Sequence, residues 1–221
     1  TTANAGPKQQ LCNTSFAALA GNMPASGTGK WSYMSGPSFA TVSFTNASDP
    51  GTTVNGLTAG THQFAWTISN GTCTESTRIV DITIYPPTVA GTLAADATVC
   101  VSDNTGSLLI SGYTGNIIHW ESSFDNGVSW NILNNTSALF TYTNLRVTTS
   151  YRALVKSGPC NTLYTNSVTI NVTPVTAPGR LSPASARVCA TFNSGTLQLS
   201  GFTGSVIRWE ISADKGNTWA S

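Results

Sequence analysis

The sequence predicts an all-β protein built as an extended array of antiparallel β-sandwich domains. The first observation is an internal repeat, because five marker residues return after a step of 89 residues: Cys100, Gly106, Gly112, Trp120 and Trp130 as Cys189, Gly195, Gly201, Trp209 and Trp219. That step is too long for a solenoid repeat and suits a sandwich of about 100 residues. The second observation is abundant Thr, Ser and Asn, which favour strands and turns. The third is that no stretch shows sustained helical periodicity.

We divide the chain into three units at two proline-containing segments, 86–87 and 174–178. Residues 1–86 are predicted to form a first sandwich, residues 87–174 a second, and residues 175–221 the N-terminal half of another copy of the second. Proline ends a strand because it cannot donate to the ladder. We therefore expect separate units in an extended arrangement, with little buried between them apart from the linker prolines.

Short alternating runs place the strands of both complete units. In the first unit we expect strands at 17–20, 30–34 and 40–44, followed by a hairpin of 63–68 and 76–84. Asn70–Gly71 lies between the two hairpin strands and favours a tight primed turn. In the second unit the sequence predicts strands at 108–110, 117–121, 130–133, 139–142, 151–155 and 167–172.

The repeated strand at 117–121 predicts which side chains enter the core. Alternation places Ile118 and Trp120 on one face and Ile117, His119 and Glu121 on the other. The next copy keeps large apolar residues on the first face, at Ile207, Trp209 and Ile211. Trp120 and Trp209 are therefore predicted core residues. Because the third unit lacks counterparts of the later strands, its apolar face is expected to be uncovered.

Two eight-residue segments resemble the Asp-box of sialidase-type propellers. They are Ser123–Trp130, with Asp125 and Gly127, and Ser212–Trp219, with Asp214 and Gly216. In that family the box is structural: Asp and Gly hold a turn and the tryptophan packs beneath it. The arginine cluster and the tyrosine–carboxylate pair of sialidase chemistry have no counterpart here, so the resemblance implies a turn, not catalysis.

The segment 145–151 resembles the tyrosine corner of sandwich domains, in which a phenol bonds back to the upstream backbone. Tyr151 would be the corner residue of the second unit. The first unit has His62 near the matching place, after Leu57. His62 and His119 are the only histidines of the chain, and neither neighbours a cluster of Cys, Asp or Glu in the sequence. We interpret them as a corner residue and a surface residue.

Composition argues against several classes of function. Charged residues make up 9% of the chain and the formal net charge is +1, against about 25% charged residues in ordinary soluble proteins. This gives no basic surface for nucleic acid or acidic lipid, and no apolar run approaches the roughly 18 residues of a membrane span. We expect no enzyme activity, no cofactor, no metal, no nucleic acid and no membrane insertion.

The cysteines recur at nearly equal separations: Cys12 and Cys73 lie 61 residues apart, and Cys100 and Cys160 lie 60 apart. We interpret this as one disulfide inside each unit, which implies an oxidising, extracytoplasmic compartment; the alternative is reduced, buried cysteines. Cys189 is expected to be unpaired within this chain, with its natural partner near position 249. The absence of a C-x-x-C pair leaves zinc and thioredoxin chemistry without their ligand spacing.

The motifs of 112–130 and 141–153, with Ser157–Cys160, resemble the tandem Ig-like repeats of giant Bacteroidota cell-surface proteins, above all the SprB-like adhesins of gliding motility. Segments 19–24, 27–31 and 69–73 make the first unit similar to the PKD-like repeats that accompany them. The resemblance implies type IX secretion, display on the outer membrane, and partners among neighbouring repeats, the gliding and secretion machinery, and an extracellular surface or polysaccharide. The family's C-terminal sorting domain is not in this sequence.

Two functional classes follow from these observations. The first is a stalk or adhesin segment that provides reach and surface attachment. The second is a carbohydrate-binding or spacer module of a secreted polysaccharide-degrading enzyme, which needs a flat exposed pair of aromatic rings. Exposure of Trp66, Trp130 or Tyr113 distinguishes them. No signal peptide opens the sequence, which we interpret as a mature protein or a piece of a longer one.

Overall fold

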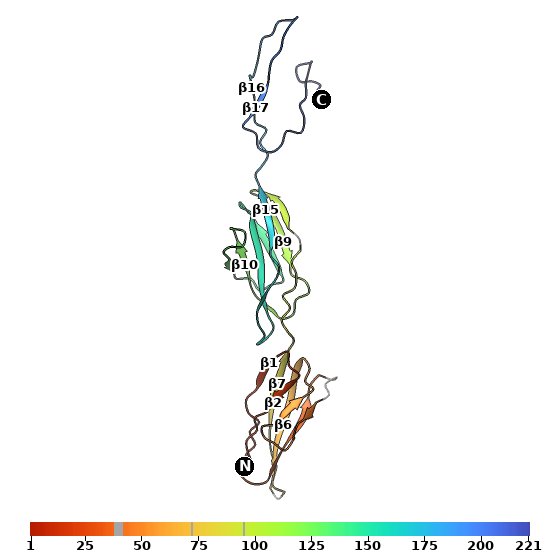
Figure 1. Cartoon of the computed structure of the whole chain (residues 1–221), viewed down its shortest axis with the longest axis vertical. Coiled ribbons are helices and arrows are strands. Elements are labelled where there is room, and N and C mark those ends of the chain that lie inside the picture. Colours follow the sequence, from red (N-terminus) through yellow and green to blue (C-terminus); the bar gives the residue numbers. More distant parts are fainter. Residues whose placement is uncertain (38–41, 72, 95) are drawn as a thin grey trace.

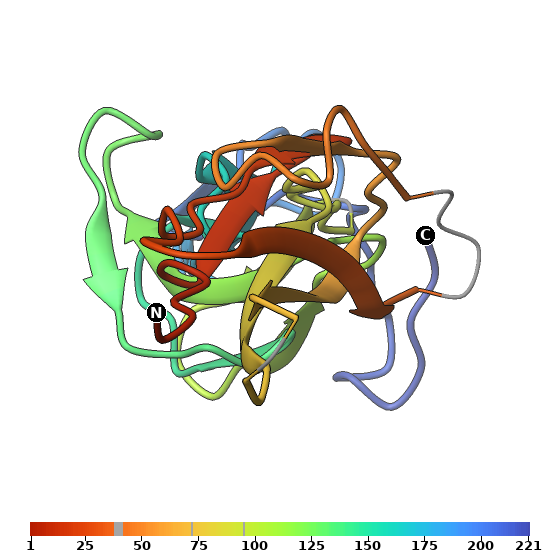
Figure 2. The ribbon, with the colours of Figure 1, turned by 90° about the horizontal axis from the view of Figure 1, so that it is seen from below.

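The computed structural model describes the whole chain except residues 38–41, 72 and 95, and among the described residues it contains strands and no helix. The predicted all-β class is confirmed. Figure 1 shows an extended molecule in which the N-terminus and the third unit lie at opposite ends of the long axis. Figure 2 views the molecule along this axis, so that the units lie one behind another.

Two sheets form the first sandwich. One has the order β1-β7-β6-β3 and consists of β1 (Gln9–Cys12), β7 (Ser76–Tyr85), β6 (Gly60–Ser69) and β3 (Thr28–Ser35). The other has the order β2-β5-β4 and consists of β2 (Phe16–Ala18), β5 (Thr53–Asn55) and β4 (Ser43–Phe44). The predicted strands at 17–20 and 30–34 are found with shifted ends. The prediction at 40–44 falls partly on residues 40 and 41, outside the described residues, and a strand is present at 43–44.

The second sandwich has the same plan. Its larger sheet has the order β11-β10-β13-β15-β8. These strands are β11 (Asn131–Leu133), β10 (Asn116–Ser123), β13 (Thr149–Lys156), β15 (Val168–Thr173) and β8 (Ala97–Cys100). A short strand, β14 (Leu163–Tyr164), also pairs with β13. The smaller sheet pairs β12 (Leu139–Thr143) with β9 (Thr105–Leu109). Each of the six predicted strands overlaps an observed one. Among the described residues, no sheet contains strands from both sandwiches.

A short N-terminal strand runs parallel to the last strand in each sandwich. β1 pairs with β7 from Gln9 opposite Ile82 to Cys12 opposite Tyr85, and β8 pairs with β15 in the same way. Neither strand was predicted, because a run of four residues is too short to show a clear alternation. The expectation of purely antiparallel sheets is wrong at these two pairs, and they determine where the cysteines lie.

Each sandwich has its own core. In the first, Trp31 and Trp66 are buried with ring centroids 5.1 Å apart. A Cβ atom on Gly29 would lie 2.1 Å from Cζ2 of Trp66, so this ring requires glycine beside it. In the second, Trp120 is fully buried as predicted, stacks on Phe140 at 5.1 Å, and donates its indole N–H to a main-chain carbonyl. The domain limits 1–86, 87–174 and 175–221 remain our division of the chain.

The hairpin of β6 and β7 is confirmed, but its turn is longer than predicted. The last paired residues are Ile68 and Ser76, so the connection spans more than the two residues of a primed turn. Gly71 has a left-handed φ of 79°, and the side-chain oxygen of Asn70 accepts a hydrogen bond from the main-chain N–H of Cys73 at 2.9 Å. The Asn–Gly pair therefore marks the place of the turn, not its length.

A β-bulge changes the faces of β10. The register with β13 shifts between Ile117 and His119, so the extra residue inverts the alternation on its N-terminal side. Ile117 is 6% exposed and Ile118 is 42% exposed. The predicted placement of these two isoleucines is therefore wrong, while Trp120, beyond the bulge, points inward as predicted.

The third unit contains only β16 (Arg180–Ser182) paired with β17 (Gln198–Ser200). Its apolar side chains are uncovered, as expected: Ile207 is 93% and Ile211 is 74% exposed. Trp209, predicted as a core residue, is 53% exposed. The reason is that residues 175–221 contain no counterpart of β12, whose Phe140 stacks on Trp120 in the second sandwich.

The bulge gives a direct mutational test. Ile117→Ala should destabilise the second sandwich by about 2–5 kcal/mol, the usual cost of truncating a buried isoleucine. Ile118→Ala, the same change on the neighbouring exposed residue, should stay within about 0.5 kcal/mol. Urea denaturation of the two variants measures the difference. Equal losses, or a larger loss for Ile118→Ala, would contradict the bulge.

Candidate functional site

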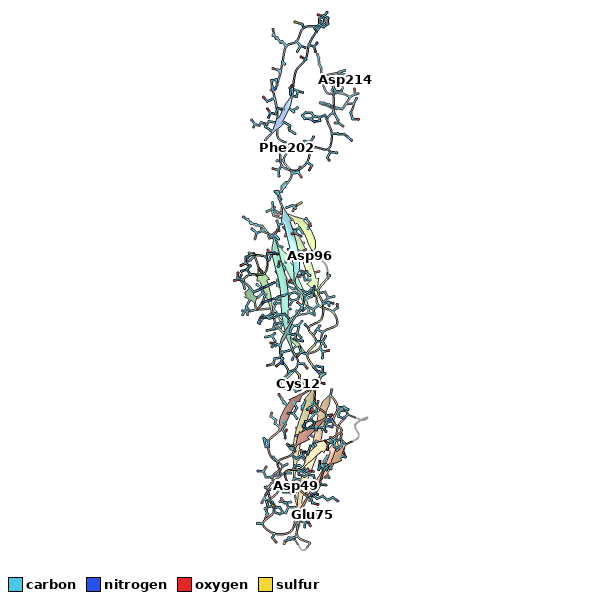
Figure 3. The ribbon with its side chains drawn as sticks, viewed as in Figure 1. Cys12, Asp49, Glu75, Asp96, Phe202 and Asp214 are labelled. Carbon is cyan, nitrogen blue, oxygen red and sulfur yellow. A yellow bond between two sulfur atoms is a disulfide. The ribbon has the colours of Figure 1, made fainter. Side chains whose placement is uncertain are left out.

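The joint between the two complete sandwiches is closed by a disulfide. Cys12, the last residue of β1, bonds to Cys160, which lies in the turn after β13. Their Cα atoms are 5.1 Å apart, within the range that a disulfide requires. The bond joins residues 148 positions apart in the sequence. Figure 3 places Cys12 at the contact of the two units.

The turn that carries Cys160 is built to approach the first unit closely. The N–H of Cys160 donates to the carbonyl of Ser157 at 2.9 Å, and Gly158 takes a left-handed φ of 49°. A Cβ atom on Gly158 would lie 2.3 Å from the ring of Tyr85, the last residue of β7. The N–H of Ser157 donates to the hydroxyl of Thr88 at 3.0 Å. The joint thus contains a packed turn and a covalent bond in addition to the linker prolines, contrary to the expectation of little contact.

The predicted pairings Cys12–Cys73 and Cys100–Cys160 are wrong. Cys12 lies opposite Tyr85 at one end of β7, and Cys73 precedes the other end of that strand. Ten residues of strand span about 30 Å at roughly 3.3 Å per residue, far beyond disulfide reach. Cys73, Cys100 and Cys189 are free and exposed, which also disagrees with the alternative of reduced, buried cysteines. The equal spacings reflect the repeat, not bonding.

The two Asp-box segments form the same turn. The carboxylate of Asp125 accepts hydrogen bonds from the hydroxyl of Ser123 at 2.8 Å and from both the N–H and the hydroxyl of Ser129. Gly127 has a φ of 87°, and Trp130 donates its indole N–H to the carbonyl of Gly127 at 3.0 Å. The hydrogen bond from the Ser129 hydroxyl, with the others, lowers the pKa of Asp125 to about 2.

The second copy repeats the hydrogen bonds of the aspartate in the third unit. Asp214 accepts from Ser212 and from the N–H and hydroxyl of Thr218, Gly216 has a φ of 92°, and hydrogen bonds led by the Thr218 hydroxyl lower the pKa of Asp214 to about 2. Trp219 is 62% exposed, because no completed sandwich lies beneath it. This turn therefore depends on local hydrogen bonds and not on the surrounding fold.

An ionic and aromatic cluster covers the outer face of the second sandwich. Arg152 on β13 donates from Nε to Glu121 on β10 at 2.7 Å. Its guanidinium lies 4.0 Å from the ring centroid of Trp130 and 3.9 Å from that of Tyr164, which places it against two aromatic rings. The cluster cross-links four strands or turns of one sheet. It stabilises the outer face of this sheet, which no second sheet covers.

Glu121 is the buried member of this cluster and is 5% exposed. Burial alone raises its pKa, but hydrogen bonds with Arg152, His119 and Tyr164 outweigh that cost and hold the pKa below its ordinary value. Burial and the bond to Glu121 raise the pKa of Tyr164. The alternation placed Glu121 outward but did not show its role. Glu121 and Arg152 are direct cross-strand partners, so pairing the predicted strands would have found this ion pair.

The two predicted corner residues are both buried. Nε2 of His62 forms a hydrogen bond with the carbonyl of Thr58 at 2.9 Å, and Nδ1 forms one with the hydroxyl of Tyr33 at 3.3 Å. With a proton on Nε2, this nitrogen donates to the carbonyl of Thr58 and Nδ1 accepts from the hydroxyl of Tyr33. His62 therefore bonds back to the upstream backbone, as the tyrosine of a corner does. Tyr151 packs on Phe140 at 5.2 Å, and burial raises its pKa. Its hydroxyl bonds to the side chain of Thr149 and, among the described residues, to no upstream backbone group, so the predicted corner bond is not found. Both ring nitrogens of His62 thus have partners within the first sandwich.

The surface offers no flat pair of exposed rings among the residues singled out. Trp66 is fully buried, and Arg152 covers one face of Trp130. Tyr113 is 38% exposed and lies apart from both in the sequence. Across the described ranges, no group of three or more His, Cys, Asp or Glu could hold a metal ion. The same part of the chain has no helix long and apolar enough to cross a membrane.

Comparisons with known proteins agree with this architecture. Residues 89–174 match a family described as a domain of unknown function, DUF8696. No curated protein sequence matches the chain. Among solved structures, murine CEACAM1b is similar with a TM-score of 0.51 at 16% identity, over 78% of this chain and 99% of that one.

Two further solved structures are similar at lower TM-scores. The PKD domain of the KIAA 1837 protein is 26% identical over 38% of this chain and 86% of its own, with a TM-score of 0.34. An I-band fragment of titin is 11% identical over 79% of this chain and 66% of its own, with a TM-score of 0.45. The chain has an Ig-like all-β fold, and a disulfide with this fold indicates an extracellular or secreted protein.

The Asp-box carboxylates give a pH prediction. Asp125 and Asp214 should titrate near pH 2, below the value of about 3.9 for an unfolded aspartate. Because the folded pKa is depressed, their stabilisation is complete above the unfolded pKa and is lost as the pH falls through about 2. Carboxyl-carbon NMR titration measures both values, with the urea-unfolded chain as reference. Titration of either group near 3.9 in the folded chain would contradict the hydrogen-bonded turn.

Proposed function

We propose that this chain is a non-catalytic repeat segment of a large exported cell-surface adhesin, in which it supplies reach and carries tension. The observation that supports this most directly is the Cys12–Cys160 bond, which crosses the joint between sandwiches arranged end to end. The bond joins the end of the first sandwich to a turn of the second. It resists separation and bending of two consecutive units.

The strand order suits a load applied along the long axis. The chain enters the first sandwich through β1 and leaves it through β7, and these two strands are parallel neighbours. Pulling the ends apart moves β1 and β7 in opposite directions along their own axes. When the Cys12–Cys160 bond is absent, all hydrogen bonds between β1 and β7 are loaded together in shear instead of opening one by one. β8 and β15 repeat this arrangement in the second sandwich.

The disulfide also changes the path of the force. Tension applied at Thr1 reaches Cys12 and passes through the sulfur bridge to Cys160 without following the main chain between them. The intervening residues form a closed covalent loop that includes most of both cores. A pull on the ends therefore cannot lengthen that loop while the bond is intact.

The finer assignment is a SprB-like adhesin of gliding motility, exported by type IX secretion and attached to the outer membrane. It is supported by the repeat motifs of 112–130 and by a disulfide of the kind that forms in oxidising compartments. Its partners would be neighbouring repeats, the gliding and secretion machinery, and an extracellular surface or polysaccharide. The carbohydrate-binding alternative loses its main support, because Trp66 is buried and Arg152 covers one face of Trp130.

Single-molecule pulling between the two chain ends tests the mechanical role. Without the bond, the segment between Cys12 and Cys160, 148 residues in separation, becomes extensible. At roughly 3.4 Å per residue this adds about 500 Å of contour length. The distance already spanned in the folded chain is small, because the two Cα atoms are 5.1 Å apart. Cys12→Ala should show this added length, and the oxidised wild-type chain should not.

The matched control is Cys100→Ala, the same substitution at the equivalent strand end of the second sandwich, where the cysteine is free. It should extend like the wild type. Release of the full length by the oxidised wild-type chain would show that the joint does not carry the load.

Surface labelling tests the cellular role separately. Antibodies against this chain should label intact, gliding cells of the source bacterium, and the label should move along the cell body. Labelling that requires permeabilised cells, or that stays fixed while cells glide, would contradict the adhesin assignment and leave the mechanical result unaffected.

A further inference from the structure

Cys12 and Cys100 occupy the same position in successive sandwiches. Each is the last residue of the short N-terminal strand, and each lies opposite the last residue of the final strand: Cys12 opposite Tyr85, and Cys100 opposite Thr173. The residue after Tyr85 and the residue after Thr173 is in both cases a linker proline. Both cysteines are therefore at the end of the sandwich that faces the next unit.

The hydrogen bonds around these two strand ends are also equivalent. The N–H of Asn13 donates to the carbonyl of Tyr85 at 2.9 Å, and the N–H of Val101 donates to the carbonyl of Thr173 at 2.8 Å. The main chain therefore presents both cysteines in the same way. One of them bonds to the following unit, and the other is an exposed thiol.

Cys73 and Cys160 form a second equivalent pair. Both lie in the connection that follows the next-to-last long strand, in the sequences Asn70–Cys73 and Ser157–Cys160, which share a polar residue, a glycine and a cysteine at the same spacing. Both glycines have a positive φ, 79° and 49°. In each case the cysteine N–H donates to the first residue of the segment. The N–H of Cys73 donates to the side-chain oxygen of Asn70, and that of Cys160 to the main-chain carbonyl of Ser157, both at 2.9 Å.

We propose that Cys12–Cys160 is one rung of a disulfide ladder that runs along the array. The strand-end cysteine of each unit bonds to the turn cysteine of the unit that follows. Cys100 would then bond to the turn cysteine of the third unit. Cys73 would bond to the strand-end cysteine of a unit on its N-terminal side. Figure 3 shows Glu75, beside Cys73, at the end of the first sandwich away from the joint.

The third unit repeats the local geometry of the second. The side-chain amide of Asn193 donates to the carbonyl of Cys189 at 2.8 Å, as that of Asn104 does to Cys100 at 2.7 Å. The second linker keeps proline at the position after the strand and threonine two residues later, as the first linker has Pro86 and Thr88. One difference is that threonine replaces Tyr85, whose ring packs on the turn in the first joint.

Each rung forms by ordinary thiol–disulfide exchange. Two cysteine thiols lose two protons and two electrons and form one S–S bond, and a small-molecule or protein disulfide takes up the electrons and protons to become two thiols. Glutathione disulfide serves as this oxidant in vitro. The ladder would also replace the earlier expectation that Cys189 pairs within its own unit. This inference rests on the joint geometry and not on the adhesin assignment.

Completing the third unit tests the ladder on the full chain. A copy of residues 133–174 placed after Ser221 continues the repeat in register and supplies a turn cysteine at position 249. After oxidation with glutathione disulfide, peptide mapping without reduction should find Cys12–Cys160 and a second bond from Cys100 to that cysteine. Cys73 and Cys189 should remain open to alkylation. A bond from Cys189 to position 249, or an alkylated Cys100, would overturn the proposal.

A second measurement uses the chain at its present length and does not depend on folding of the added strands. In Cys12→Ala, the turn cysteine Cys160 loses its partner. If bonding occurs only between units, Cys100 and Cys160 lie at opposite ends of one sandwich and both stay alkylatable in the oxidised monomer. A Cys100–Cys160 bond in this variant would show that the cysteines of one unit can pair, and would overturn the ladder. Cys73→Ala serves as the control and should keep Cys12–Cys160.

Discussion

The distance between the two ends of a sandwich determines the covalent structure of this chain. Parallel pairing of the first and last strands fixes Cys12 at the end where the chain leaves the unit. The turn cysteine of the same unit lies at the other end, about 30 Å away along ten strand residues. A cysteine in such a unit reaches only its neighbour across a joint. The sulfur chemistry of the array is therefore a consequence of strand order.

This arrangement couples the stability of the two sandwiches. In the chain-entropy description, closing a loop of about 100 residues or more restricts the unfolded chain by about 5 kcal/mol. The loop between Cys12 and Cys160 contains most of both cores, so neither unit alone gains the full effect. The restriction acts on the state in which both are unfolded. One unit that remains folded therefore limits the freedom of the other through the bond.

The sequence was sufficient for features that depend on local pattern. The all-β class, the buried Trp120 and the Asp125 turn follow from alternation, repeat and turn chemistry, and all are present in the structure. It was insufficient where one residue changes a register or where distant segments meet. The bulge beside Ile117 inverts the alternation without a glycine or proline to mark it. The cysteine spacing suggested pairs within a unit, because separation along the chain carries no information about which end of a sandwich a residue occupies.

The position of the disulfide also corresponds to where the fold has least other support. Each sandwich buries large side chains, such as Trp31 and Trp66 in the first, and needs no covalent bond to hold its sheets together. Besides the disulfide, the described contacts of the joint involve the linker, the Ser157–Cys160 turn and the ring of Tyr85. Contacts of this size resist bending weakly, because apolar stabilisation scales with the area removed from water. A covalent bond adds strength at the joint without requiring a larger interface, and this allows units with independent cores to act as one extended rod.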